Sequence, residues 1–114
     1  MNTENTIFDK ILRKEIPTNA VYEDDWVLAF RDINPQAPVH VLIVPRKALA
    51  KVDDMAMEDR ELVGHLLYVA AEVARKEKLT DYRLVINNGS GAGQSVFHLH
   101  VHLLGGRPLS WPPG

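Results

Sequence analysis

Three histidines at alternate positions, His98, His100 and His102, are the residues of this chain whose spacing most clearly permits chemistry. Successive side chains of a β-strand point to opposite faces, so a strand over residues 98–104 would place all three imidazoles on one face. The apolar residues between them would then face a core on the other side. A helix would separate neighbouring histidines by about 200°. The spacing therefore predicts a strand that presents a row of imidazoles.

The segment that precedes the histidines, residues 87–95, is rich in glycine. Its glycines alternate along the chain: Gly89, Gly91 and Gly93. Glycine permits positive φ angles, and successive backbone N–H groups in such a loop can bind an anion. No Gly-Lys-Ser/Thr follows, as a P-loop requires, and a strand follows where the dinucleotide-binding motif has a helix. The segment therefore predicts a phosphate-binding loop that leads into the imidazole row, with Gln94 and Ser95 at the junction.

The histidine row has three interpretations. The first is structural, a polar strand face without chemistry. The second is a metal site, because neutral imidazole is a common zinc ligand and Asp32 or His40 could extend the ligand set. The chain has no cysteine, however, and a metal site would leave the glycine loop unexplained. The third is nucleophilic catalysis on phosphorus, which accounts for both features and which the pattern favours.

In the catalytic interpretation, His100 is the nucleophile. A neutral imidazole is a good nucleophile near pH 7, and its phosphoryl adduct is labile enough to hydrolyse. His98 and His102 would orient His100 and help to neutralise the phosphoryl oxygens. The Ser95 hydroxyl would hand a proton to the leaving group.

The rest of the chain predicts one α+β domain over residues 1–114, with a mostly antiparallel sheet. Thr6 is expected to cap a short helix that ends before Pro17. Apolar residues at helical spacing predict one long helix over residues 54–78, with an apolar face wide enough for both the sheet and a partner subunit. Strands are predicted at residues 20–22, 26–33, 39–45, 82–87 and 98–104.

Several single residues outside the histidine row have two interpretations. Asp32 either caps the turn that follows it or accepts hydrogen bonds from a ribose diol. His40, in an apolar strand, is either a satisfied core group or packs behind the three histidines. Ile7 and Phe8 either fix the first helix to the sheet or form one wall of a ligand pocket. His65, within the long helix, is expected to be non-catalytic.

Composition limits the classes of partner. The chain has 114 residues and a formal net charge of −2, with its basic residues dispersed, so nothing electrostatic favours duplex nucleic acid. The absence of cysteine excludes disulfides and thiolate catalysis and fits a reducing compartment. Residues 1–5 lack signal-peptide character, and no apolar run approaches the roughly 20 residues of a membrane span. We expect a cytoplasmic protein that binds neither nucleic acid nor a membrane.

The run His98-Leu99-His100-Val101-His102-Leu103-Leu104 matches the signature of the histidine-triad (HIT) superfamily at every position. Residues 6–8 with 13–17, 30–38, 89–96 and 105–114 resemble the HINT branch of that superfamily in order and spacing. The final Trp-Pro-Pro-Gly argues against the dinucleoside polyphosphate hydrolase branch. A histidine at position 102, where the nucleotidyltransferase branch has glutamine, argues against that branch. The resemblance covers essentially the whole chain.

This resemblance implies a HIT-like fold of five strands, one short helix and one long helix, with the sheets of two subunits joined in a homodimer. It implies hydrolysis of the P–N bond of adenosine 5′-phosphoramidates through a nucleotidyl intermediate on His100, without a metal or other cofactor. The expected partner is a purine nucleotide: AMP, GMP or an adenosine phosphoramidate. The resemblance also implies that the C-terminal tail, with Trp111, lies near the site of the second subunit.

The same resemblance assigns roles to individual residues. The implied catalytic residues are His100, His98, His102, His40 and Ser95. The implied nucleotide-binding residues are Ile7, Phe8, Phe30, Asp32, Ile33, Leu42, Asn87, Gly93, Gln94, Ser95, Val96, His100 and His102. A different class of function uses the same pocket: a purine nucleotide-binding module, regulatory or interactive, whose hydrolysis is incidental. The sequence leaves both functions open.

Overall fold

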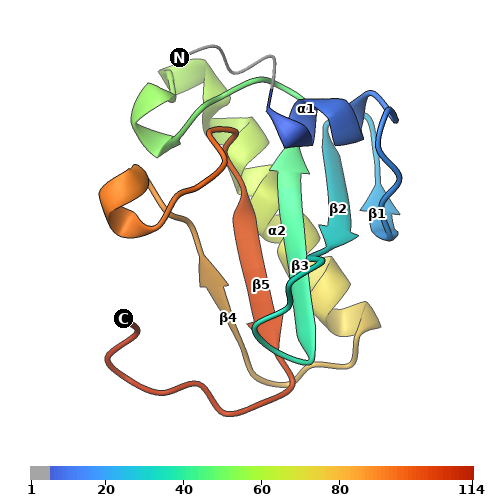
Figure 1. The fold of residues 1–114 in the computed structure, drawn as a ribbon, viewed down its shortest axis with the longest axis vertical. Coiled ribbons are helices and arrows are strands. Elements are labelled where there is room, and N and C mark those ends of the chain that lie inside the picture. The colour runs from blue at the N-terminus through green and yellow to red at the C-terminus, as the bar shows by residue number, and fades with distance from the viewer. Residues whose placement is uncertain (1–5) are drawn as a thin grey trace.

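The computed structural model describes residues 6–114 (Figure 1). Residues 1–5, on which the expectation of no signal peptide rests, lie outside the described residues. The helices are α1 (Ile7–Leu12) and α2 (Arg60–Lys76). The strands are β1 (Ala20–Glu23), β2 (Val27–Arg31), β3 (Val39–Pro45), β4 (Tyr82–Val85) and β5 (Val101–Gly105). Short 3₁₀ turns occupy Val52–Asp54, Met57–Asp59 and Ser90–Ala92.

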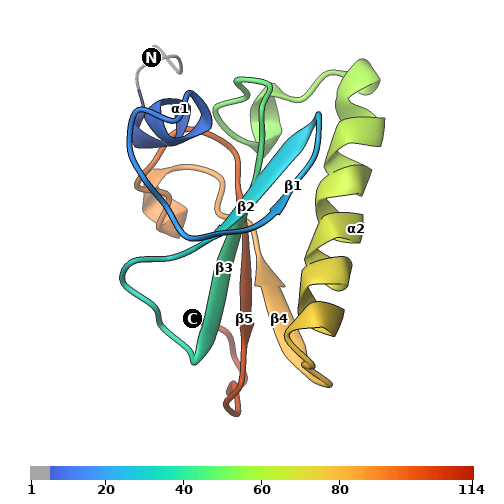
Figure 2. The same cartoon turned by 90° about the vertical axis from the view of Figure 1, so that its right-hand side faces the viewer.

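The five strands form one sheet in the order β1-β2-β3-β5-β4, and every neighbouring pair is antiparallel. The long helix α2 covers one face of this sheet, and α1 lies at one end of the opposite face (Figure 2). The predicted α+β class, the five-stranded antiparallel sheet and the pair of one short and one long helix are confirmed.

The central strand β3 shows how one sequence supplies both faces of the sheet. Val41 and Ile43 belong to the cluster packed against α2, whereas Leu42 and Val44 belong to the cluster packed against α1. Because both faces are covered, β3 is apolar at nearly every position rather than at alternate ones. His40 shares its face with Leu42 and Val44, so it lies on the α1 side of the sheet.

The short helix α1 begins with a capping box. The Thr6 hydroxyl accepts a hydrogen bond from the Asp9 backbone N–H, and the Asp9 carboxylate accepts one from the Thr6 backbone N–H. The predicted cap at Thr6 and the helix end before Pro17 are confirmed. Helix α2 begins at Arg60, six residues later than predicted, because the two 3₁₀ turns at Val52–Asp54 and Met57–Asp59 occupy the predicted first turns.

The prediction of a strand over residues 98–104 is wrong at its start. Strand β5 begins at Val101, which pairs with Ile43 of β3. Pairing cannot continue regularly toward residue 98, because β3 ends at Pro45, which has no backbone N–H to donate. The Leu99 N–H bonds instead to the Leu49 carbonyl, 2.7 Å away.

Within residues 6–114, no helix has the length and apolar character needed to cross a membrane.

Candidate active site

A cavity of about 260 Å³ opens on the α1 side of the sheet. Its wall includes ten of the residues that the sequence assigned to nucleotide binding: Ile7, Phe8, Phe30, Asp32, Ile33, Leu42, Ser95, Val96, His100 and His102. The apolar members come from α1, from β2 and the segment after it, from β3 and from the loop before β5. The polar members are Asp32, Ser95, His100 and His102. The cavity therefore combines an apolar slot with a small group of polar side chains, as small-molecule sites do.

His100 is the imidazole with a free, unprotonated nitrogen at this cavity. Its Nδ1 lies 2.7 Å from the backbone oxygen of His98. A carbonyl oxygen only accepts hydrogen bonds, so Nδ1 carries the hydrogen and Nε2 carries the lone pair. Phe8 packs edge-on against the ring, with 4.9 Å between centroids. Burial lowers the pKa of His100, the bond to the His98 carbonyl opposes that effect, and the charge on His98 lowers the pKa further.

His40 and His102 form a chain of hydrogen bonds whose direction is fixed at one end. The Gln36 backbone N–H donates to His40 Nδ1 over 3.0 Å, so His40 Nε2 must carry the hydrogen. That Nε2–H donates to His102 Nδ1 over 2.9 Å. The hydrogen of a neutral His102 is thereby placed on its Nε2, the nitrogen left to face a ligand. Burial, followed by the charges of His100 and His40, lowers the pKa of His102 to about 4.

Asp32 caps the turn that follows it, and its side chain also lies on the cavity wall. One carboxylate oxygen accepts a hydrogen bond of 2.9 Å from the Asn34 backbone N–H, which is the predicted turn cap. The other lies 3.5 Å from His40 Nε2, and the side chain lines the cavity. A carboxylate has several acceptor sites, so capping the turn leaves acceptors for ligand hydroxyls. His40 likewise packs behind the histidine row, as one of its two interpretations stated.

His98 does not share the cavity with the other two histidines of the row. Its ring is fully buried, and its Nε2 lies 2.7 Å from the Pro45 carbonyl oxygen. Its Nδ1 faces the Asp9 carboxylate of α1 at 3.5 Å. The sequence did not single out Asp9 beyond the helix cap. The only available signal was an acidic residue at the third helical position, which capping alone explains.

The glycine loop is held by its own hydrogen bonds. The backbone N–H groups of Ala92, Gly93 and Gln94 donate to carbonyls of Gly89 and Ser90. The Gln94 side chain accepts from the Gly89 N–H and donates to the carbonyls of Ala50 and Val96. These four backbone N–H groups are already used within the loop, so a phosphate bound by this segment would have to use its other donors.

Positive φ angles occur at only two of the three alternating glycines, Gly89 and Gly93. Neither Gly93 nor the predicted binding residues Asn87 and Gln94 line the cavity. What reaches the cavity from this segment is its end, Ser95 and Val96. The end of the loop therefore supplies a hydroxyl to the cavity wall, and anion binding by the loop stays a prediction.

Asp32, His40 and His102 could be considered as metal ligands, since one ligand atom of each lies within 4.8 Å of the others. The hydrogen bonds at His40 argue against that use. His40 Nδ1 already accepts the Gln36 N–H, so a metal on Nε2 would require an imidazole without any hydrogen. The metal would also displace the bond to His102. These residues therefore do not fit a metal ion.

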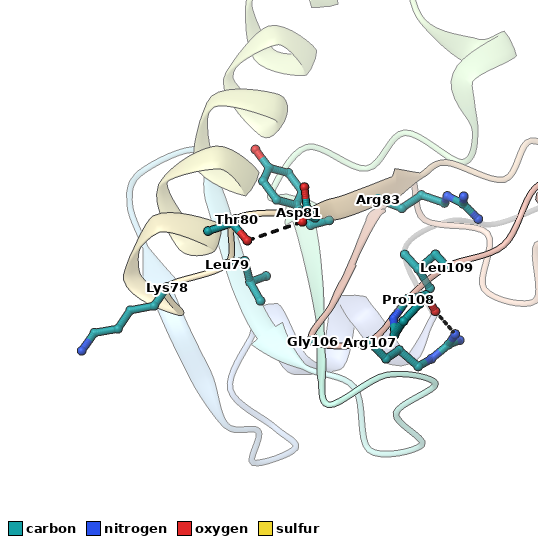
Figure 3. A pocket seen from close by; sticks show the side chains of 10 residues that line it. Lys78, Leu79, Thr80, Asp81, Arg83, Gly106, Arg107, Pro108 and Leu109 are labelled. Atoms are coloured by element: carbon teal, nitrogen blue, oxygen red, sulfur yellow. Dashed lines mark hydrogen bonds between the residues drawn. The ribbon is translucent and has the colours of Figure 1, made fainter.

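A larger cavity of about 640 Å³ lies elsewhere, between the start of β4 and the C-terminal tail (Figure 3). Its charged side chains do not converge, and Lys78 points away from the other labelled residues. Arg107 is bound to the carbonyls of Gln36 and Pro108.

His65 is also remote from the histidine cluster, because it pairs with Asp24 at 2.6 Å and stacks on Tyr68 of the same helix. Neither feature resembles the cavity at His100.

The fold and the site define a class: a single antiparallel sheet that presents a histidine cluster beside an apolar slot. The family model of the HIT domain matches residues 13–109, and the chain belongs to this family. An uncharacterised HIT-like protein of Synechocystis is 61% identical over 112 residues, covering 97% of this chain and 98% of that protein. The 14 kDa zinc-binding protein of Zea mays is 58% identical over 115 residues, covering 96% and 88%.

Solved structures show the same fold. A HIT family hydrolase from Legionella pneumophila superposes with a TM-score of 0.94 at 51% identity, covering 96% of this chain and all of that chain. A histidine triad nucleotide-binding protein from Candida albicans superposes with a TM-score of 0.80 at 30% identity, covering 95% and 83%. The recognition of the HIT superfamily from the histidine signature is confirmed.

Proposed function

We propose that this protein hydrolyses the P–N bond of adenosine 5′-phosphoramidates through a nucleotidyl intermediate on His100. The observation that carries the proposal is the unprotonated Nε2 of His100 at the cavity, fixed by the bond from Nδ1 to the His98 carbonyl. Burial lowers the pKa of this imidazole, so it is a neutral nucleophile at neutral pH. The names of the Legionella and Candida relatives, a hydrolase and a nucleotide-binding protein, agree with this assignment.

In the first step, the lone pair of His100 Nε2 attacks phosphorus and the P–N bond breaks. The hydroxyl of Ser95, on the cavity wall, hands its proton to the departing amine. His102 donates its Nε2–H to a phosphoryl oxygen, because the chain from Gln36 through His40 has already used its Nδ1. In the second step, water attacks phosphorus, returns a proton to Ser95 and releases His100.

The apolar slot and Asp32 suit the nucleoside part of the substrate. Phe8 and Phe30 pack edge-to-face, with 5.6 Å between centroids, and form with Leu42 the floor against which a flat purine base would lie. Ile33 lines the cavity and is 95% exposed, so its side chain is free to pack against a bound base. The carboxylate of Asp32 would accept hydrogen bonds from the ribose hydroxyls.

We also propose that the active form is a homodimer. Strand β4 is an edge of the sheet (Figure 1). The side chains of Tyr82 and Leu84 on this strand are exposed. Leu67 and Tyr68 of α2 are exposed as well. An uncovered edge strand beside exposed apolar side chains is a surface suited to pairing with a second copy.

The experiment that tests the activity is steady-state hydrolysis of an adenosine 5′-phosphoramidate with EDTA present throughout. Wild type is expected to turn over, whereas His100→Asn and His100→Ala lose at least about 10³-fold in kcat, because among the described residues lining the cavity no other imidazole presents an unbonded lone pair. His65→Gln, which alters a histidine remote from the cavity, is the matched control and retains activity.

Three results would contradict the proposal. Loss of wild-type activity in EDTA would indicate a metal-dependent reaction; the maize relative is named a zinc-binding protein. Full activity of His100→Asn would exclude the nucleophile. Tight AMP binding without turnover would make this chain a nucleotide-binding module.

A further inference from the structure

Two buried ionisable side chains, Asp9 and His98, face each other behind the active site without a role in the chemistry described so far. Asp9 belongs to α1 and is 8% exposed, and His98 is completely buried. The His98 Nδ1 is 3.5 Å from one carboxylate oxygen of Asp9. Among the described residues, it is the one buried side-chain polar atom without a hydrogen-bond partner.

The hydrogen positions around His98 require a further proton. Its Nε2 lies 2.7 Å from the Pro45 carbonyl, which only accepts, so Nε2 carries a hydrogen. In a neutral ring, Nδ1 would then present a lone pair to a carboxylate oxygen, and two acceptors would face each other in a site closed to water. Such a contact is repulsive and strongly unfavourable when buried. One proton between Nδ1 and the carboxylate removes the conflict.

The other oxygen of Asp9 indicates which partner holds that proton. It accepts two hydrogen bonds, from the Thr6 backbone N–H at 3.0 Å and from the Thr6 hydroxyl at 2.8 Å. Two donors stabilise the ionised form of a carboxyl group. The carboxylate charge in turn favours a proton on the imidazole that it faces.

We infer that Asp9 and His98 form a buried ion pair in which both ring nitrogens of His98 carry hydrogen, and that Asp9 is a positioning residue for His100. Asp9 acts through two contacts of His100. The His98 backbone oxygen, held by this pair, orients the His100 ring, and Phe8, the neighbour of Asp9 on α1, packs against that ring. The ion pair therefore joins α1 to the segment that carries the nucleophile.

The charge of His98 also acts on His100. It lowers the pKa of His100, in addition to the larger effect of burial. Asp9 from α1 faces His98, His102 from β5 faces His100, and the charge of Asp32 also acts on His100, whereas His40 contacts His102 rather than either ring. Removal of the charge on His98 would thus raise the pKa of His100. The acid limb of the pH–rate profile would then shift to higher pH.

Histidine side-chain ¹⁵N NMR of the uniformly labelled wild type at pH 7 tests the pair without any substrate. Among the four histidines of the cluster, we expect only His98 to have both nitrogens at protonated positions, and His40, His100 and His102 to have one protonated nitrogen each. The assignment comes from His98→Gln, which removes the signal. The signals of His65, which pairs with Asp24 outside the cluster, are assigned with His65→Gln. A His98 with an unprotonated Nδ1 in the wild type overturns the inference.

Two substitutions of Asp9 separate the effect of its negative charge from the effect of its contact with His98. Asp9→Asn keeps the helix cap and can donate its amide hydrogen to a neutral His98, so we expect an unprotonated Nδ1 and near-normal kcat at pH 7. Asp9→Ala loses the contact, and we expect roughly tenfold lower kcat with little change in KM, because the nucleophile is less well oriented. Asp25→Asn, an exposed acidic residue, is the matched control.

The kinetic arm rests on the proposed phosphoramidase activity. There the acid limb of kcat/KM is expected at higher pH in Asp9→Asn than in the wild type and in Asp25→Asn. An acid limb that does not move, or a His98 in Asp9→Asn that keeps both hydrogens, overturns the role of Asp9. A wild type that does not turn over contradicts the proposed function alone, because the NMR spectrum still decides the ion pair.

Discussion

Three of the four imidazoles have a hydrogen position set by a backbone group: the Gln36 N–H for His40, the His98 carbonyl for His100 and the Pro45 carbonyl for His98. These bonds involve the backbone, so they persist as long as the fold does. The sequence identified the histidines and Asp32, because residue type and spacing carry that signal. It could not assign the hydrogens or identify Asp9, because both depend on contacts between segments far apart in the chain.

The low pKa values of His100 and His102 also predict how stability varies with pH. An unfolded histidine binds a proton below about pH 6.5, whereas folded His102 resists protonation down to about pH 4. As pH falls between these values, the unfolded state takes up protons that the folded state does not, so stability falls. For His102, which is only partly exposed, we expect a loss on the order of 2 kcal/mol between pH 7 and 4.

Thermal unfolding at pH 7 and pH 4.5 measures this effect. The melting temperature of the wild type is expected to fall with pH, and the fall is expected to be smaller in His102→Asn, which has no imidazole to protonate at this position. His65→Gln serves as the histidine control outside the cluster. An equal fall in wild type and His102→Asn would show that His102 is not the group responsible.

At the scale of elements, the sequence predicted the bounds of a helix or strand correctly where residues next to the boundary in the chain determine it. The cap at Thr6 and the bounds of β3, Val39–Pro45, follow from residue type and apolar continuity. The starts of α2 and β5 were misplaced because neighbours elsewhere decide them. Asp59 accepts the Ala56 N–H and pairs with Lys47, which holds the 3₁₀ turn before α2. Pro45 on β3 ends the ladder that residues 98–100 would otherwise extend.

The conformation of the glycine loop also depends on contacts outside the segment. Its composition permits either an open anion site or a closed turn, and the choice depends on Gln94, whose side chain ties the loop to Ala50 and Val96. No local pattern distinguishes a glutamine that faces a ligand from one that faces the backbone. The structure assigns Gln94 to the support of the loop and leaves Ser95 at the cavity.

At the scale of the whole molecule, the exposed edge strand β4 predicts self-association. Leu84→Lys places a charge at this edge in each subunit, and like charges that meet across a two-fold axis repel. We expect the wild type to have the mass of a dimer by light scattering and Leu84→Lys to shift toward the monomer. Met57→Lys, an equally drastic change at an exposed position outside β4, should stay dimeric. A monomeric wild type would contradict the proposed assembly.

The central claim is that His100 becomes covalently nucleotidylated, and the most direct measurement is the mass of the enzyme during turnover. Wild type mixed with an adenosine 5′-phosphoramidate would be quenched in base within milliseconds to seconds, and the adduct mapped by peptide mass spectrometry. The account predicts an adenylyl group on His100 that forms and decays at least as fast as kcat and is absent from His100→Asn. Turnover without an adduct, or an adduct on another residue, would contradict it.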